Sequence, residues 1–197
     1  TRKVGAFTIG LMSVRTGDDD RTATPGTTLS VMRLRRDILR RSSIGVLVTS
    51  RSESPSTPGA SSEAYGLDAA FGFFDNLTIN AYIARSAVPG VSGDDLSQRA
   101  QVNYNADRYG VQLEYLGVGD HFNPEMGFLR RDDFRRTFAS LRYSPRPTSV
   151  PLVRRFSYQA SMAYLTDGRG TLETRESSGS FSVEFANSDR LSVGVSH

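Results

Sequence analysis

Hydrophobic and polar residues alternate with a period of two along most of the chain. Leu77, Ile79, Ala81 and Ile83, for example, alternate with mainly polar or small residues within segment 77–85. This period places successive side chains on opposite faces of a β-strand, whereas an amphipathic helix repeats its apolar residues every three or four positions. No segment has a convincing helical repeat. The sequence therefore predicts an all-β fold.

The alternation predicts ten strands and the start of an eleventh. No connecting segment carries the helical pattern of a parallel crossover, so we expect consecutive strands to pair in an antiparallel meander. The expected strands cover residues 4–14, 28–39, 43–49, 64–73, 77–85, 99–104, 111–115, 134–143, 156–164 and 181–185, with the last beginning near residue 191.

Long and short connections alternate through the first seven. The long ones are rich in Gly, Ser, Asp and Pro, and an up-and-down sheet would place all of them at one end. Outer-membrane barrels have this pattern of short turns, long loops and strands of about ten residues. We therefore expect an antiparallel up-and-down transmembrane β-barrel, or part of one, with residues 1–197 as a single domain of a longer chain. The long connections are residues 16–27, 52–62, 87–94 and 117–132.

The same alternation also fits a soluble barrel or sandwich that buries its apolar faces. A membrane barrel turns those faces to lipid and keeps a polar interior. Tyr and Phe recur near the strand ends, as they do in the aromatic girdles of membrane barrels, although the chain has no Trp. In a soluble sandwich these aromatic residues would be core. The pattern favours the membrane barrel and leaves the soluble alternative open.

The composition narrows the classes of site and partner. There is no Cys, which excludes disulfides, thiolate metal sites and Cys nucleophiles. The net charge is +3, and Lys3 is the only lysine. The arginines are spread along the chain among Asp and Glu, which indicates ion pairing within the protein rather than a nucleic-acid partner.

Several charged residues in or beside the expected strands could project into a barrel interior. Opposed arginines and carboxylates can build a selective constriction, and they can equally fill a narrow barrel with paired charges. An arginine on a lipid-facing surface would be costly away from the interfaces. The candidates for a lumen or constriction are Arg33, Arg35, Asp68, Arg99, Glu114, Arg135 and Glu184.

One loop region carries the remaining candidate chemistry. Asp120, His121 and Glu125 are weak metal-ligand candidates, and the acidic run 18–20 is more typical of solvated loop charge. No cofactor is expected. The alternative to a metal site is a folded loop with a turn at Asn-Pro, which packs on the barrel wall or plugs the mouth of the barrel. The plug candidates are Phe122, Asn123, Pro124 and Phe128.

The segment Gly-Asp-His-Phe-Asn-Pro-Glu-Met-Gly-Phe-Leu-Arg-Arg-Asp-Asp-Phe at residues 119–134 resembles the C-terminal barrel region of the DUF5916 proteins. Further similar segments occur in the same order at residues 33–37, 41–45, 69–74, 104–110 and 187–190. The resemblance implies an outer-membrane β-barrel of a diderm bacterium. It implies no settled activity. The carbohydrate-binding family 9-like domain that often precedes such barrels is not in this sequence.

The expected function is that of an outer-membrane β-barrel acting as a porin-like pore or a membrane anchor. Its expected partners are outer-membrane lipid and lipopolysaccharide, and a periplasmic or surface domain or other envelope proteins. The alternatives are a surface-assembly barrel that binds a partner and a soluble barrel or sandwich binding module. An enzyme is not expected, because the chain has two histidines and no Gly-x-Ser-x-Gly motif.

Overall fold

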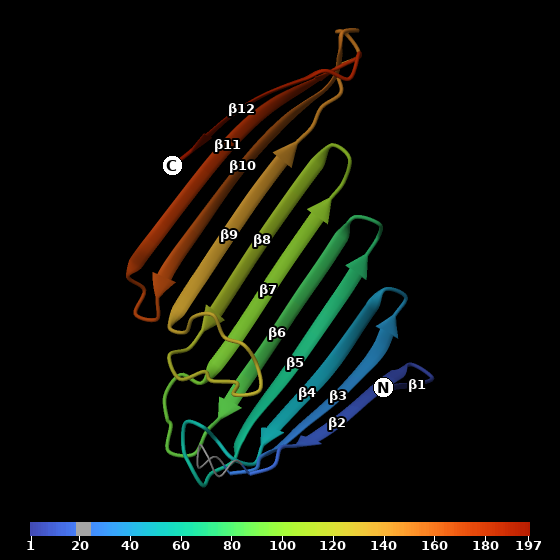
Figure 1. The fold of residues 1–197 in the computed structure, drawn as a ribbon. Coiled ribbons are helices and arrows are strands. Elements are labelled where there is room, and N and C mark those ends of the chain that lie inside the picture. The colour runs from blue at the N-terminus through green and yellow to red at the C-terminus, as the bar shows by residue number, and fades with distance from the viewer. Residues whose placement is uncertain (19–24) are drawn as a thin grey trace. The chain divides into compact units, whose positions relative to one another are not determined.

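The computed structural model describes residues 1–18 and 25–197 of the chain, and Figure 1 shows their strands. These residues form no helix, so they include no helix that could cross a membrane. The strands are β1 (Arg2–Val4), β2 (Phe7–Arg15), β3 (Thr28–Leu39), β4 (Ser42–Arg51), β5 (Ser62–Phe73), β6 (Leu77–Ala87), β7 (Leu96–Asn105), β8 (Tyr109–Val118), β9 (Phe134–Tyr143), β10 (Val153–Asp167), β11 (Leu172–Phe185) and β12 (Arg190–Ser196).

The strands pair in sequence order in one antiparallel sheet, from β1 to β12. The predicted all-β, up-and-down arrangement is confirmed. The sheet is not closed into a barrel, because β1 and β12 each have a single neighbour. The described residues form twelve strands, and the additional one is β1. Gly5, with a φ of 59°, turns the chain back so that Val4 pairs with Phe7 instead of continuing the same strand.

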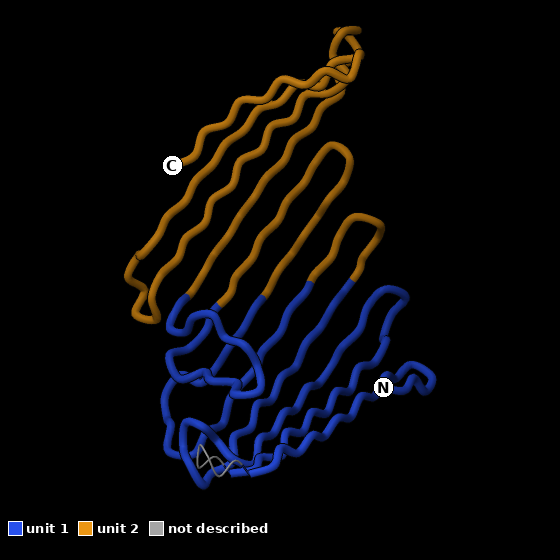
Figure 2. Tube along the Cα trace, viewed as in Figure 1, with its two compact units in different colours: residues 1–71, 80–99, 117–134 blue, residues 72–79, 100–116, 135–197 orange. Residues whose placement is uncertain are grey.

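The chain divides into two compact units, coloured separately in Figure 2. The sequence had predicted a single domain. The connections that follow β2, β4, β6 and β8 all lie at one end of the antiparallel strands, as predicted from the alternation of long and short connections. Unit 1 contains residues 1–71, 80–99 and 117–134, and unit 2 contains residues 72–79, 100–116 and 135–197.

In unit 1, the registers of β2 to β5 separate an apolar face from a polar face. Directly opposite residues share a face of the sheet. At the end of the strands that carries the long connections, a row of four polar residues borders the apolar face. This row consists of Ser13, Ser30, Ser50 and Glu63. On these strands the apolar face carries Phe7, Ile9, Leu11, Met32, Leu34, Ile44, Val46, Val48, Tyr65, Leu67 and Ala69, and the mainly polar face carries Thr8, Gly10, Arg33, Arg35, Gly45, Gly66 and Asp68 together with the apolar Met12, Val31 and Leu47.

In unit 2, β10 to β12 show the same separation with different residues. Bulges between Val153 and Arg155 and between Leu165 and Thr166 leave the central register regular. The apolar face carries Phe156, Tyr158, Ala160, Met162, Gly179, Phe181, Val183, Leu191, Val193 and Val195, and the polar face, hereafter the serine face, carries Ser157, Gln159, Ser161, Ser178, Ser180, Ser182, Ser192 and Ser196.

Few apolar side chains are buried. Among the described residues the buried hydrophobic ones are Val88, Val118, Phe122 and Val183. The apolar faces themselves remain exposed, with Leu67 56% and Leu11 72% accessible to solvent. Most of the apolar surface that the alternation creates therefore has no covering layer within either unit.

Candidate functional site

The polar face of unit 1 is organised around an ion pair between β3 and β5. Arg33 Nη1 lies 2.5 Å and Nη2 2.8 Å from the two carboxylate oxygens of Asp68. Gly45 on β4 lies between them, and a Cβ there would stand 2.7 Å from Arg33 Nη2. Glycine therefore leaves the space in which the guanidinium reaches the carboxylate. The two side chains are 36% and 35% exposed, so the pair is partly screened by water.

Two other arginines predicted to face the interior also lie on the polar face. Arg35 Nε is 3.8 Å from Asp37, whose other carboxylate oxygen is 3.1 Å from Lys3 Nζ. Arg99 and Ser97 are two residues apart on β7, so their side chains lie on the same face of the sheet. The Ser97 hydroxyl is 3.3 Å from that of Tyr82 on β6. The assignment of both arginines to a lumen stays a prediction, because the sheet is not closed.

The nearly buried carboxylate of Glu114 pairs with an arginine that the sequence did not single out. Its Oε1 accepts a hydrogen bond from Arg136 Nη1 at 2.8 Å, and the Glu114 side chain is 8% exposed. Arg135, the candidate proposed from the sequence, is the next residue along β9 and is exposed. Successive side chains point to opposite faces of a strand, so Arg136 and not Arg135 shares the side of Glu114.

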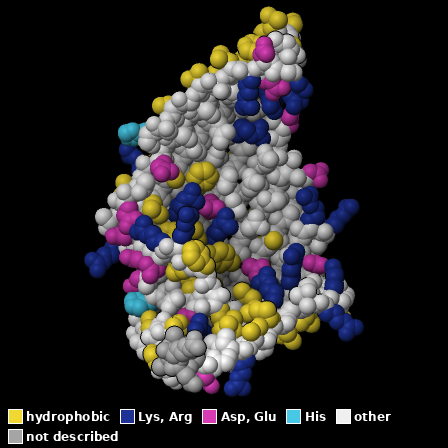
Figure 3. Space-filling view, viewed as in Figure 1, with side chains coloured by type: hydrophobic (Ala, Val, Ile, Leu, Met, Phe, Trp, Pro, Cys, Tyr) yellow, Lys and Arg dark blue, Asp and Glu magenta, His cyan; other side chains and the backbone are white. Residues whose placement is uncertain are grey.

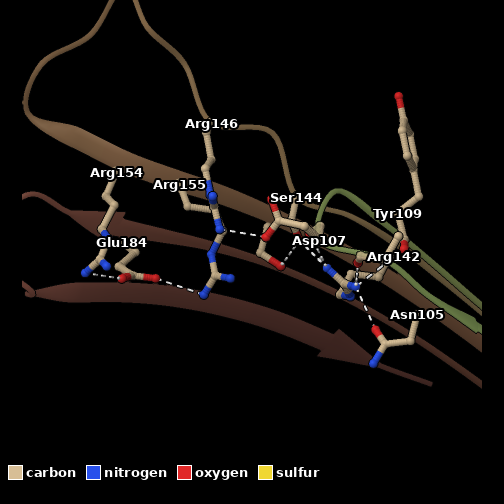
Figure 4. Close-up of polar contacts among 11 residues, drawn as sticks. Asn105, Asp107, Tyr109, Arg142, Ser144, Arg146, Arg154, Arg155 and Glu184 are labelled. Atoms are coloured by element: carbon tan, nitrogen blue, oxygen red, sulfur yellow. Dashed lines mark hydrogen bonds and ion pairs between the residues drawn. The ribbon is translucent and has the colours of Figure 1, made fainter. Parts of the chain in front are cut away.

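A second group of charges gathers at the turn end of unit 2 (Figure 4). Glu184 accepts a hydrogen bond from Arg155 at 2.9 Å and forms an ion pair with Arg154 at 3.2 Å. Arg142 donates to Asn105 Oδ1, to the carbonyls of residues 106 and 107, and to the hydroxyl of buried Ser144. Arg142 therefore holds the turn between β7 and β8 in place, a role that no local sequence pattern predicts.

Positive and negative side chains are mixed and not segregated. On the face seen in Figure 3, Arg and Lys side chains lie among those of Asp and Glu. This arrangement agrees with the expectation of ion pairing within the protein, as between Arg33 and Asp68 and between Arg136 and Glu114.

The connection between β8 and β9 is tied to a neighbouring loop through Glu125. The carboxylate accepts hydrogen bonds from the hydroxyls of Ser54 and Ser62, both at 2.5 Å, and from the backbone N–H of Ser56 at 3.4 Å. Burial raises the pKa of the Glu125 carboxyl, but the serine hydrogen bonds outweigh it and hold the pKa below its ordinary value of 4.5. The loop is thus fastened by an ionised carboxylate.

The plug candidates take different positions in this loop. Phe122 is buried, whereas Phe128 is 90% exposed. Asn123 donates from its backbone N–H to Ser86 Oγ at 2.9 Å and from its amide to Ser56 Oγ at 3.1 Å. Pro124 begins a turn, since its carbonyl accepts a hydrogen bond from the N–H of residue 127. The loop is therefore folded and anchored at one end, with an apolar tip in solvent.

The three metal-ligand candidates do not converge. Asp120 Oδ1 lies 2.6 Å from His121 Nδ1, and this hydrogen bond lowers the pKa of the exposed Asp120 carboxyl. Glu125 is engaged with serines instead. Among the described residues no group of three or more His, Cys, Asp or Glu could hold a metal ion. Residues 19 and 20 of the acidic run lie outside those that the structure describes.

Two glycines let the loops approach closely at this point. A Cβ on Gly93 would collide with the His121 ring, and one on Gly119 would collide with the Asp94 carbonyl. The His121 ring has a carboxylate at Nδ1, and among the described residues no hydroxyl hydrogen-bonds to the ring. The His121 ring therefore joins Asp120 and the backbone at Gly93 in one contact between the two loops.

Comparisons with known proteins add no family. No protein-family model matches the chain, and neither a curated protein nor a solved structure is significantly similar to it. The resemblance to the DUF5916 proteins therefore stays a prediction from the sequence.

Proposed function

We propose that this chain is part of an outer-membrane β-barrel that acts as a pore or as a membrane anchor. The observation that carries the proposal is the exposure of a continuous apolar face on strands whose other face is polar. On β2 to β5 that face includes the exposed side chains of Leu11, Val46 and Leu67. Such a surface is costly in water and favourable in lipid.

The aromatic residues of unit 2 support the same proposal. Tyr109, Tyr143 and Tyr158 form a row across three neighbouring strands near their turn ends, with ring centres 5.3 and 6.2 Å apart. Phe181 continues the row at 5.0 Å from Tyr158. Amphipathic Tyr rings favour the level where hydrocarbon meets headgroups. The row is therefore suited to mark one membrane interface.

The polar faces support a pore more than an inert anchor. Arg33 with Asp68 and Arg136 with Glu114 place paired charges on the side opposite the apolar face. The loop held by Glu125 stands at the end of the strands where the long connections gather. Paired charges and a fastened loop are features that restrict passage through a barrel.

A partner-binding role is the second candidate. The edge strand β12 exposes Leu191, Val193 and Val195, with up to 73% of a side chain accessible. Unpaired edges with apolar side chains recruit other chains. In this alternative, the apolar faces of a surface-assembly barrel or a soluble binding module would be covered by protein instead of lipid.

Fractionation and heat-modifiability test the proposal. The protein, expressed at full length in a diderm bacterium, should occur in the outer-membrane fraction and migrate faster on a gel when unboiled than when boiled. Planar-bilayer conductance of the purified protein then separates a pore from an anchor. A soluble protein with no mobility shift would contradict the membrane proposal and favour the partner-binding alternative.

A further inference from the structure

Arg36 lies on the apolar face without an acidic partner. It is directly opposite Phe7 on β2 and Ile44 on β4, so it shares their face. Its guanidinium lies 5.1 Å from the centre of the Phe7 ring. Among the described residues no carboxylate stands within ion-pair distance of it. Arg35, the preceding residue, instead lies on the polar face beside Asp37.

An apolar hollow of about 550 Å³ adjoins this guanidinium. Arg36 itself lines the hollow together with large apolar side chains. The small side chains of Ala69 and Ala81 leave the space between them. The other apolar lining residues include Leu34, Val46, Leu67 and Ile83. The hollow is open to solvent, and Gly45, Asp68 and Tyr82 also line it. The Asp68 carboxylate pairs with Arg33 on the opposite face of the sheet, so Arg36 is the charged side chain that borders the hollow on the apolar face.

The position of Arg36 along the strand suits a membrane interface. It precedes the last residue of β3, Leu39, by three positions, which is about 10 Å of extended chain. An arginine on the lipid side costs little near an interface and several kcal/mol at the centre of the bilayer. A guanidinium without a carboxylate partner is well matched to a phosphate, which it can bind through two hydrogen bonds.

We propose that Arg36 and this hollow form a binding site for one anionic phospholipid. The phosphate pairs with the Arg36 guanidinium, and an acyl chain lies in the hollow between Leu34, Val46 and Leu67. This inference rests on the proposed function, because an acyl chain reaches the hollow only if the apolar face meets a membrane. Charge and shape are complementary to such a lipid at one place: a lone cation stands beside an apolar depression.

Lipid retention tests the site. The full-length protein is reconstituted into vesicles of phosphatidylethanolamine and phosphatidylglycerol, extracted again in a nonionic detergent, and assayed for the phospholipid it keeps. The wild-type protein should retain phosphatidylglycerol in preference to phosphatidylethanolamine. Arg36→Gln should lower the retained phosphatidylglycerol about five-fold, the effect of one cation at an anionic surface. Arg35→Gln, one residue away on the polar face, should retain it as the wild type does.

A second variant separates the hollow from the charge. Ala81→Phe fills the space while Arg36 is kept, and it should also lower phosphatidylglycerol retention. Equal retention by the wild type and Arg36→Gln would overturn the site, as would an equal loss in Arg35→Gln. Each variant is checked for heat-dependent mobility, which reports folding. A wild-type protein that inserts but shows no lipid preference overturns the site alone, whereas one that does not insert overturns the proposed function as well.

Discussion

The polar faces of β3–β5 in unit 1 and of β10–β12 in unit 2 are built on the same strand alternation with different chemistry. On β3–β5 the face holds charged residues, with Arg33 bound by both nitrogens to Asp68 across Gly45. On the central part of β10–β12 it is the serine face, where Ser161 and Ser178 hydroxyls lie 2.7 Å apart. One face depends on specific partners and the other presents short side chains that bond to each other or to water.

The difference shows that the alternation of apolar and polar residues determines the fold, whereas the residue types on the polar face can vary. A charge on a strand needs a partner at a fixed register, because an unpaired half-buried charge is penalised. A serine hydroxyl is satisfied by a neighbour or by water at little cost. The apolar faces of the two regions are alike, as expected if both meet the same apolar environment. The polar faces differ because each can serve its own purpose.

The largest expected loss of stability comes from placing a charge on the apolar faces that the two regions share. Met162→Arg in unit 2 and Leu67→Arg in unit 1 each place a charge on an apolar face. Both should destabilise the protein in lipid vesicles by about 2–4 kcal/mol if their positions lie near the bilayer centre, measured by urea unfolding. Ser161→Arg, on the serine face beside Met162, is the matched control and should cost less than about 1 kcal/mol. Equal effects at residues 161 and 162 would contradict the two-faced account.

The next effect concerns the turn end of unit 2, where charges replace the serine pattern. Arg142→Gln removes hydrogen bonds to Asn105 Oδ1, two backbone carbonyls and Ser144 Oγ. We expect a loss of about 2–3 kcal/mol, because charged hydrogen bonds to partly buried groups are lost. Arg146→Gln breaks a single exposed pair with Asp107 and should cost less than about 1 kcal/mol. A similar cost for both, in the same urea titration, would show that Arg142 is not a clamp.

A smaller effect compares the two polar faces directly. A double-mutant cycle of Arg33→Gln and Asp68→Asn should give a coupling energy of about 1 kcal/mol, since the pair is partly exposed. The coupling should shrink as salt is raised. Ser180→Ala on the serine face should change stability by less than about 0.5 kcal/mol at any salt concentration. A coupling energy near zero between Arg33 and Asp68 at low salt would contradict the account that the polar face of β3–β5 depends on specific partners.

The most local effect is the pH response of the loop between β8 and β9. The pKa of Glu125 is held below 4.5 in the folded protein, so its serine hydrogen bonds stabilise the loop fully above about pH 4.5. That stabilisation is lost as pH falls through the lowered pKa. The protection factors of residues 119–133, which are exchange rates corrected for the intrinsic effect of pH, should therefore fall at acidic pH.

The matched variants make this pH response specific. Glu125→Gln should have lower protection factors than the wild type at neutral pH, and these should not fall further at acidic pH. Asp120→Asn, in the same loop, should keep it, because Asp120 bonds to His121 and not to the serines. Equal protection factors of the wild-type loop at both pH values would rule out the carboxylate as the group that holds it.

The alternation predicted eleven of the twelve strands, their antiparallel order and the end that carries the long loops. It missed β1 as a separate strand and residues 172–180 of β11. The partners on the polar face were harder to predict. Arg33 and Asp68 were both identified, but Arg136 was missed in favour of Arg135, because a shift of one residue moves a side chain to the other face. The serines that hold Glu125 are 63 to 71 residues away in sequence. Contacts at such separations leave no local pattern from which they could be predicted.

Cysteine scanning across one strand tests the central claim, that the apolar face meets lipid and the polar face meets water. The chain contains no Cys, so each introduced thiol is the only one in these residues. Ala160→Cys, Ser161→Cys and Met162→Cys on β10 alternate between the faces. In vesicles, a water-soluble maleimide should label residue 161 rapidly and residues 160 and 162 slowly. Equal labelling at all three positions would contradict the claim.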